Sequence, residues 1–211
     1  AQLSDILRPL LESLPPNWPD DIDLGKVEAV IQDDGLPIVW VPRAEIVTSL
    51  LAAPDRAARV KVLLAHEDEI TADCRAVLGS ISDETLSGQL PLAVKALEAF
   101  EAGHHEAAQA LAVTVTETAV THALGSYKKA RQRAAFDPGK VTLGQLRVQA
   151  ALAPIGPFYT AWYPSWGTPA PEALSRHVTI HQADQRHYPR GNAAVAVLLA
   201  TSVLRALQEL A

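Results

Sequence analysis

Residues 192–210, NAAVAVLLATSVLRALQEL, decide the fold class of this chain. From Ala193 to Leu204 no side chain is charged, and apolar residues occupy most sides of a helix drawn through them. A helix of this kind is buried, either in the centre of a helical bundle or at a contact between subunits. The uncharged run is too short to cross a bilayer, and Thr201 and Ser202 interrupt it. We therefore expect a core helix and no association with a membrane.

The residues before this stretch repeat apolar side chains at helical spacing. Alanine and leucine are abundant and aromatic residues make up only 5%, which favours helices over a β-sandwich or barrel. The sequence therefore predicts an all-α fold, a multi-helix bundle. Its earlier helices are expected over residues 43–53, 56–81, 86–102, 104–124, 127–135 and 143–153. Residues 96–108 look like one corner of a tetratricopeptide repeat, but the pattern occurs once, so we expect an isolated helical hairpin.

Two proline-rich segments interrupt the helical pattern. Residues 3–14 are amphipathic and end at Pro15–Asp21, which predicts an N-terminal helical arm and linker over 1–21 and an all-helical domain over 22–211. Residues 154–171, before the final helix, interleave prolines with phenylalanine, tyrosine and tryptophan. Because large aromatic side chains mostly bury area, we favour a loop packed over the core, with a ligand-facing surface as the alternative.

The charge balance limits the classes of partner. The net charge is −6, and an acidic chain does not coat nucleic acid non-specifically, because phosphate affinity comes from lysine and arginine. A nucleic-acid role therefore needs a local basic patch. Residues 127–133, YKKARQR, are the main candidate, and a solvated helix face is the alternative interpretation.

Cysteine usage and targeting signals bear on the cellular compartment. The single cysteine, Cys74, excludes an intramolecular disulfide and fits a reducing compartment, and its apolar neighbours predict a core position. No positively charged leader precedes an apolar run, so we expect a cytoplasmic protein.

Cofactor and metal motifs are absent from the sequence. It has no glycine-rich dinucleotide turn, no phosphate loop and no zinc-finger pattern. Two groups have the residue types of metal ligands: His66 with Glu69 and Asp73, and Glu101 with His104. An acidic surface helix and a hairpin corner explain them as well, so we expect no cofactor and no metal site.

The strongest chemical candidate is Ser175–Gln182, SRHVTIHQ, just before the final helix. If this segment is helical, His177 and His181 lie on one face, next to Arg176. Arginine holds a phosphate through a planar fork of donors, and histidine moves protons near neutral pH. Together these groups suffice for metal-free phosphodiester cleavage, in which the arginine stabilises the developing negative charge. Two alternatives remain open: a structural role, capping helices and fastening a bend, or a site for another ligand.

These residues resemble a known family. Arg176, His177 and His181 are similar to the Arg-x(4–6)-His signature of HEPN domains, in which a polar residue usually follows the arginine. The resemblance extends to Tyr188, Asn192 and the apolar final helix. It implies a helical bundle that dimerises so that two copies of the motif line one cleft. It also implies metal-independent endoribonuclease activity, commonly in toxin–antitoxin, abortive-infection or other defence systems.

The resemblance implies a role for each motif residue. Arg176 would stabilise the phosphate and the transition state, His181 would act as general acid or base, and His177 would orient the motif or help proton transfer. The implied partners are an RNA substrate, a second copy of the chain, and an antitoxin or other protein. Candidate substrate contacts are Arg186, Arg190, Tyr188 and Trp166.

A second arginine–histidine pair fits the same spacing. Arg59 and His66 are separated by six residues, but the apolar Val60 follows the arginine and the pair lies within an amphipathic pattern. We therefore interpret this pair as a chance match to the signature.

Two other function classes compete with the ribonuclease. One is a non-catalytic helical scaffold that binds a protein through the aromatic segment or the hairpin. The other is a metal-dependent helical hydrolase.

Overall fold

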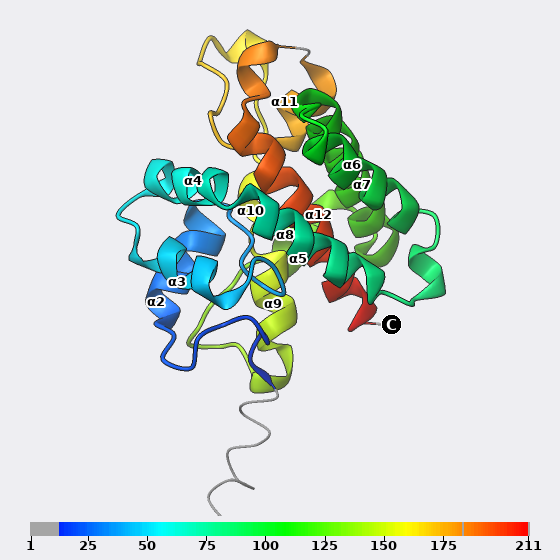
Figure 1. The fold of residues 1–211 in the computed structure, drawn as a ribbon. Coiled ribbons are helices and arrows are strands. Elements are labelled where there is room, and N and C mark those ends of the chain that lie inside the picture. The colour runs from blue at the N-terminus through cyan, green and yellow to red at the C-terminus, as the bar shows by residue number, and fades with distance from the viewer. Residues whose placement is uncertain (1–12, 183, 211) are drawn as a thin grey trace, which may run out of the picture.

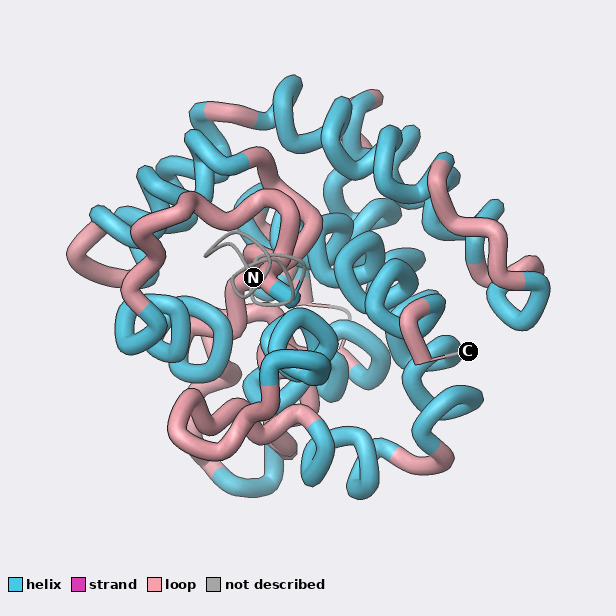
Figure 2. The backbone as a smooth tube through the Cα atoms, turned by 90° about the horizontal axis from the view of Figure 1, so that it is seen from below, coloured by secondary structure: helices cyan, strands magenta, loops and turns pink. Residues whose placement is uncertain are grey.

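The computed structural model describes residues 13–182 and 184–210. Every regular element in these two ranges is helical, and neither range contains a strand (Figure 1; Figure 2). The all-α multi-helix bundle predicted from composition and periodicity is therefore confirmed.

The final helix, α12 (Arg190–Gln208), is the central element and runs through the bundle in Figure 1. Its residues are buried without interruption from Gly191 to Leu204. The surrounding helices are α4 (Arg56–Ala65), α5 (Glu67–Gly79), α6 (Leu90–Glu101), α7 (His105–Leu124) and α9 (Leu146–Leu152). By length and composition alone α12 could cross a membrane, but most of it is buried inside the bundle, as core helices are.

The helical hairpin expected over residues 96–108 is formed by α6 and α7, which pack along each other and against α12. Gly103 makes the turn with a φ of +80°, a conformation that glycine adopts without steric cost. Cys74 of α5 is fully buried in the core, and burial raises the pKa of its thiol to about 12.

The N-terminal part covers another side of the bundle. It comprises α2 (Leu24–Glu28), a π-helical turn (Ala29–Asp33), an irregular segment over 36–42 and α3 (Ala44–Ala52). Asn17 fastens the irregular segment, since its side chain donates to the Ile38 carbonyl (3.1 Å) and accepts from the Trp40 amide (2.7 Å). Residues 17 and 18 of the expected linker are thus buried against the core. Residues 1–12, most of the predicted N-terminal helix, lie outside the described residues, and the boundary at 21 stays a prediction.

The prediction of a single helix over 56–81 was wrong. The chain forms α4 and α5 instead, interrupted at His66, whose φ of −126° and ψ of 32° are not helical. The first turn of α5 carries Glu67, Asp68 and Glu69, and acidic side chains are favoured there because the helix dipole is positive at its N-terminus. This acidic run was the signal of the break.

Two short 3₁₀ turns, Glu84–Leu86 and Leu143–Gln145, precede α6 and α9. Five further elements lie near the predicted motif. They are α8 (Tyr127–Arg133), α10 (Ile155–Phe158), a 3₁₀ turn (Pro164–Trp166), α11 (Arg176–His181) and a second 3₁₀ turn (Gln185–His187). Both α8 and α11 pack against α7, and α10 packs against α8. The motif therefore sits on a helix anchored to the core hairpin.

Candidate active site

The short helix α11 carries the whole motif. Ser175 caps it, since its hydroxyl accepts from the Val178 amide (3.4 Å), and serine is a preferred residue at this position. Val178 and Thr179 are the buried residues of this helix, which packs against α7. Arg176 and His177 are half-buried and His181 is exposed, so the motif side chains lie on the outer side of the helix.

A buried hydrogen-bond network holds α11 in place. The Gln109 amide of α7, fully buried, donates to the Thr179 hydroxyl (3.1 Å) and to the His187 carbonyl (3.0 Å). The Tyr188 hydroxyl donates to the Thr179 carbonyl (2.7 Å), and the Asn192 amide donates to the His187 carbonyl (3.2 Å). Tyr188 and Asn192 belong to the predicted resemblance. Gln109 was missed, although a glutamine among the apolar residues of a core helix is a recognisable signal.

The three motif side chains line one open pocket of about 180 Å³. Its remaining lining residues are Tyr127, Tyr159, Ala161 and Tyr163. The ring centroids of His177 and His181 are 4.9 Å apart, and the Tyr163 ring meets His177 edge to face at 4.3 Å. The structure thus brings together the guanidinium and both imidazoles that the sequence singled out.

Arg176 is held from below by Glu117, a residue of α7 that sequence reasoning did not assign to the site. The guanidinium Nη2 donates to Glu117 Oε1 at 3.2 Å, and the arginine side chain keeps 27% of its surface exposed. Three buried polar atoms beside this contact have no hydrogen-bond partner among the described residues: Arg176 Nε, Glu117 Oε2 and the Tyr159 hydroxyl. The pair therefore fixes the guanidinium of an arginine that is partly exposed and lines the pocket.

The surroundings shift two titratable groups of the pocket. Burial, together with the positive charges of His181 and Arg176, lowers the pKa of His177. Burial and the neighbouring Glu117 carboxylate raise the pKa of Tyr159, so its phenol stays protonated. At neutral pH the pocket combines a permanent cation, a neutral imidazole and a protonated phenol.

The proline and aromatic segment divides into two halves. Phe158 and Tyr159 are buried, as the packing interpretation expects. Tyr163 and Trp166 are 46% and 55% exposed and contact each other edge to face at 5.2 Å. The second half thus presents aromatic rings at the rim of the pocket, as the ligand-facing alternative expects.

The other candidate substrate contacts lie outside this pocket. Arg186 pairs with Asp184 and lines a separate pocket of about 470 Å³, and Arg190 pairs with Glu67. Tyr188 is half-buried, and its hydroxyl is bonded to the Thr179 carbonyl. Trp166 does not line the pocket itself, but its ring contacts that of Tyr163, which does. Among the four, only Trp166 is exposed beside the motif.

The basic segment 127–133 forms α8, whose first residue, Tyr127, lines the pocket. Four exposed cations follow it on this helix, and in the described ranges none of them makes an ion pair. They are Lys128, Lys129, Arg131 and Arg133.

The second arginine–histidine pair is arranged differently. The Arg59 side chain, 10% exposed, forms an ion pair with Asp34 and donates to the carbonyls of Leu50 (3.1 Å) and Ala53 (3.1 Å). His66 is half-buried and lies near Glu69 instead. The structure thus gives Arg59 a structural role, and its contacts do not include His66.

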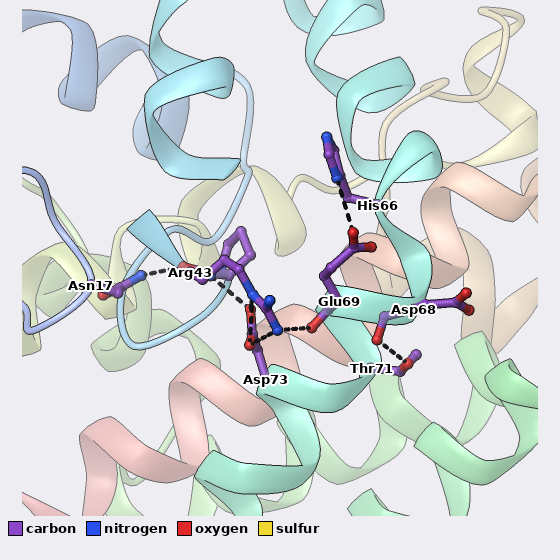
Figure 3. Close-up of polar contacts among 8 residues, drawn as sticks. Asn17, Arg43, His66, Asp68, Glu69, Thr71 and Asp73 are labelled. Carbon is purple, nitrogen blue, oxygen red and sulfur yellow. Dashed lines mark hydrogen bonds and ion pairs between the residues drawn. The ribbon is translucent and has the colours of Figure 1, made fainter. Parts of the chain in front are cut away.

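Of the two candidate metal ligands beside His66, Asp73 is engaged elsewhere. Figure 3 shows Arg43 bound to both carboxylate oxygens of Asp73, with Nη2 at 2.7 Å from Oδ1 and Nε at 3.0 Å from Oδ2. The Nδ1 atom of His66 and the Oε1 atom of Glu69 lie 3.6 Å apart. Within residues 13–182 and 184–210 no three histidine, cysteine or acidic side chains form a group that could hold a metal ion.

Comparisons with known proteins add no further constraint: no family model, no curated protein and no solved structure matches this chain.

Proposed function

We propose that this protein is a HEPN-like, metal-independent endoribonuclease that acts in toxin–antitoxin or antiphage defence. The observation that carries the proposal is the convergence of Arg176, His177 and His181 on one open pocket. The HEPN resemblance supplies the reaction class, the defence context and the homodimer. In this proposal the chain functions as a cytoplasmic homodimer, with RNA as substrate and an antitoxin as a protein partner.

The geometry supports transesterification within the RNA chain. A phosphodiester in the pocket meets the guanidinium of Arg176, which stabilises the extra negative charge of the pentacoordinate transition state. The imidazole of His181 is exposed and makes no hydrogen bond or ion pair in the described structure, so it is free to exchange a proton with the substrate. The products are a 2′,3′-cyclic phosphate and a 5′-hydroxyl.

The acidity of the chain does not conflict with an RNA substrate. The four unpaired cations of α8 follow directly on Tyr127 at the pocket wall, so the flanking phosphates of a bound strand meet local positive charge. The exposed rings of Tyr163 and Trp166 offer stacking surfaces to unpaired bases on the same rim. Both features favour single-stranded RNA.

The test uses purified full-length protein and single-stranded RNA in excess EDTA. We expect fragments that end in 2′,3′-cyclic phosphate, and we expect His181→Ala to slow their formation by roughly 10²- to 10⁴-fold. His122→Ala is the matched control, because this exposed histidine of α7 lies in a different pocket.

Each competing function has its own outcome. Intact RNA would indicate a non-catalytic scaffold, and cleavage that EDTA abolishes would indicate a metal-dependent hydrolase. Cleavage that is unchanged in His181→Ala would contradict the assigned site.

A further inference from the structure

We propose that His177 and His181 of the same chain form a complete base and acid pair, so that a single pocket cleaves RNA without an imidazole from a second copy. This inference rests on the proposed function and assigns His177 the specific role of general base. The HEPN resemblance by itself implies a cleft lined by two copies of the motif. The geometry of the pocket makes one copy sufficient.

The two imidazoles are placed to serve one phosphate. They lie four residues apart on α11, both line the 180 Å³ pocket, and their ring centroids are 4.9 Å apart. A hydrogen bond to a reacting oxygen spans about 3 Å, so nitrogens on these two rings can reach different oxygens of one phosphodiester. Arg176 faces the same space and meets the non-bridging oxygens.

The environments of the two histidines differ in a way that assigns their roles. His177 is half-buried, and the Tyr163 ring packs against it at 4.3 Å, whereas His181 is exposed to water. Desolvation disfavours a charged imidazole, so His177 rests in the neutral form that can accept a proton, and we assign the role of donor to the hydrated His181. The lowered pKa of His177 agrees with this assignment.

The charged and titratable groups around His177 come from five parts of the fold. They are Arg176 and His181 on α11, Tyr163 before the 3₁₀ turn, Tyr127 on α8, Tyr159 after α10, and Glu117 on α7. Glu117 binds Arg176, and neither imidazole of the pocket forms an ion pair with a carboxylate among the residues described here. Nothing in this set compensates a positive charge on His177.

The step is balanced within the pocket. Neutral His177 accepts the proton of the ribose 2′-hydroxyl, and the 2′-oxygen forms a bond to phosphorus. The bond from phosphorus to the 5′-oxygen breaks, and the His181 imidazolium gives its proton to that oxygen. The products leave with His177 protonated and His181 neutral, and proton exchange with water restores the starting state.

The first experiment measures the cleavage rate against pH. The wild-type profile should have an acid limb, in which the rate falls as His177 becomes protonated. His177→Ala should cleave roughly 10²- to 10⁴-fold more slowly and lose the acid limb. His177→Gln, which keeps a polar side chain, should behave in the same way, and circular dichroism should show both variants folded. Retention of the wild-type rate or of the acid limb in either folded variant would overturn the assignment.

The second experiment asks whether the pair belongs to one chain. His177→Ala and His181→Ala chains are co-expressed, purified together and compared with each variant alone. We expect no gain in activity, because neither chain then holds both imidazoles. A clear gain would show that the acid and the base come from different chains and would overturn the inference. Failure of the wild-type protein to cleave RNA would instead reject the proposed function itself.

Discussion

Two regions of this molecule contain an arginine followed by a histidine at the same type of spacing, and they use the arginine in opposite ways. Around Arg59 the guanidinium donates to two backbone carbonyls and to Asp34, and its histidine partner in sequence, His66, lies apart from it. Around Arg176 one carboxylate holds the guanidinium, Nε stays unpaired, and both imidazoles share its pocket.

The difference shows what a short sequence pattern leaves undetermined. Spacing places side chains on one face of a helix, but it does not say whether that face meets the core or an open pocket. The guanidinium of Arg59 is used to join α4 to the N-terminal part of the fold. The guanidinium of Arg176 is positioned and still available. Substitutions at the two arginines should therefore separate stability from activity.

The largest effect on stability is expected for Arg59→Ala. It leaves Asp34 half-buried without its partner and removes the donors to two carbonyls, and breaking a buried ion pair costs about 3–5 kcal/mol. Urea denaturation measures the change in the free energy of unfolding. RNA cleavage per folded molecule should stay at the wild-type level, and a selective loss of cleavage would assign this region to the site.

The largest effect on activity apart from the histidines is expected for Arg176→Ala. Loss of a group that stabilises transition-state charge lowers kcat by roughly 10²- to 10³-fold. Because the substitution leaves Glu117 without its cation, a modest loss of stability is also expected. The double variant Arg176→Ala with Glu117→Gln restores stability and not cleavage. Full activity in the single variant would remove arginine from the mechanism.

The fold was predictable because its signals are local and repeated. The apolar run of α12 predicted its burial, and Gly103 and the single hairpin of α6 and α7 followed from turn chemistry and periodicity. The break at His66 was missed because apolar spacing continues across it. The acidic side chains that favour a helix N-terminus at the start of α5 lie within this continuous apolar pattern.

Only the part of the site that is contiguous in sequence could be predicted. Arg176, His177 and His181 are close in sequence, so their shared pocket could be expected from one helix. Glu117 and Gln109 come from α7, far away in sequence, and only tertiary packing brings them to α11. The separation of Arg186 and Arg190 from the pocket has the same origin, since their acidic partners are fixed by the fold.

A smaller effect is expected for Trp166→Ala, which tests whether the exposed ring beside the Arg176 pocket binds substrate. Stacking of one base on an aromatic ring contributes about 1–3 kcal/mol, so KM for single-stranded RNA should rise about tenfold or more with little change in kcat. Trp166→Phe should recover part of the loss. Leu143→Ala is the control, because this side chain has similar exposure (48%) and does not line the pocket. An unchanged KM would mean that the exposed ring does not contact substrate.

The smallest effect is on the pH dependence of stability. It distinguishes the contacts that hold α11 from the contacts that Arg59 makes, which we call the anchors of the two regions. His187 is buried beside the cap of α11, where its Nε2 lies 3.3 Å from the Ser175 carbonyl oxygen, and burial lowers its pKa. The unfolded chain then binds more protons than the folded chain below the usual histidine pKa of about 6.5, so this histidine destabilises the fold as the pH falls through that value.

The expected size is at most about 1.4 kcal/mol per pH unit, the limit for one proton. His187→Gln, which cannot titrate, should therefore lose less stability than the wild type between about pH 7 and pH 5 in urea denaturation. An equal loss in both proteins would show that His187 does not titrate on unfolding. The anchor of Arg59 contains no histidine, and a guanidinium keeps its charge at every accessible pH. Acid should thus loosen the helix that carries the motif before it affects the contact between α4 and the N-terminal part.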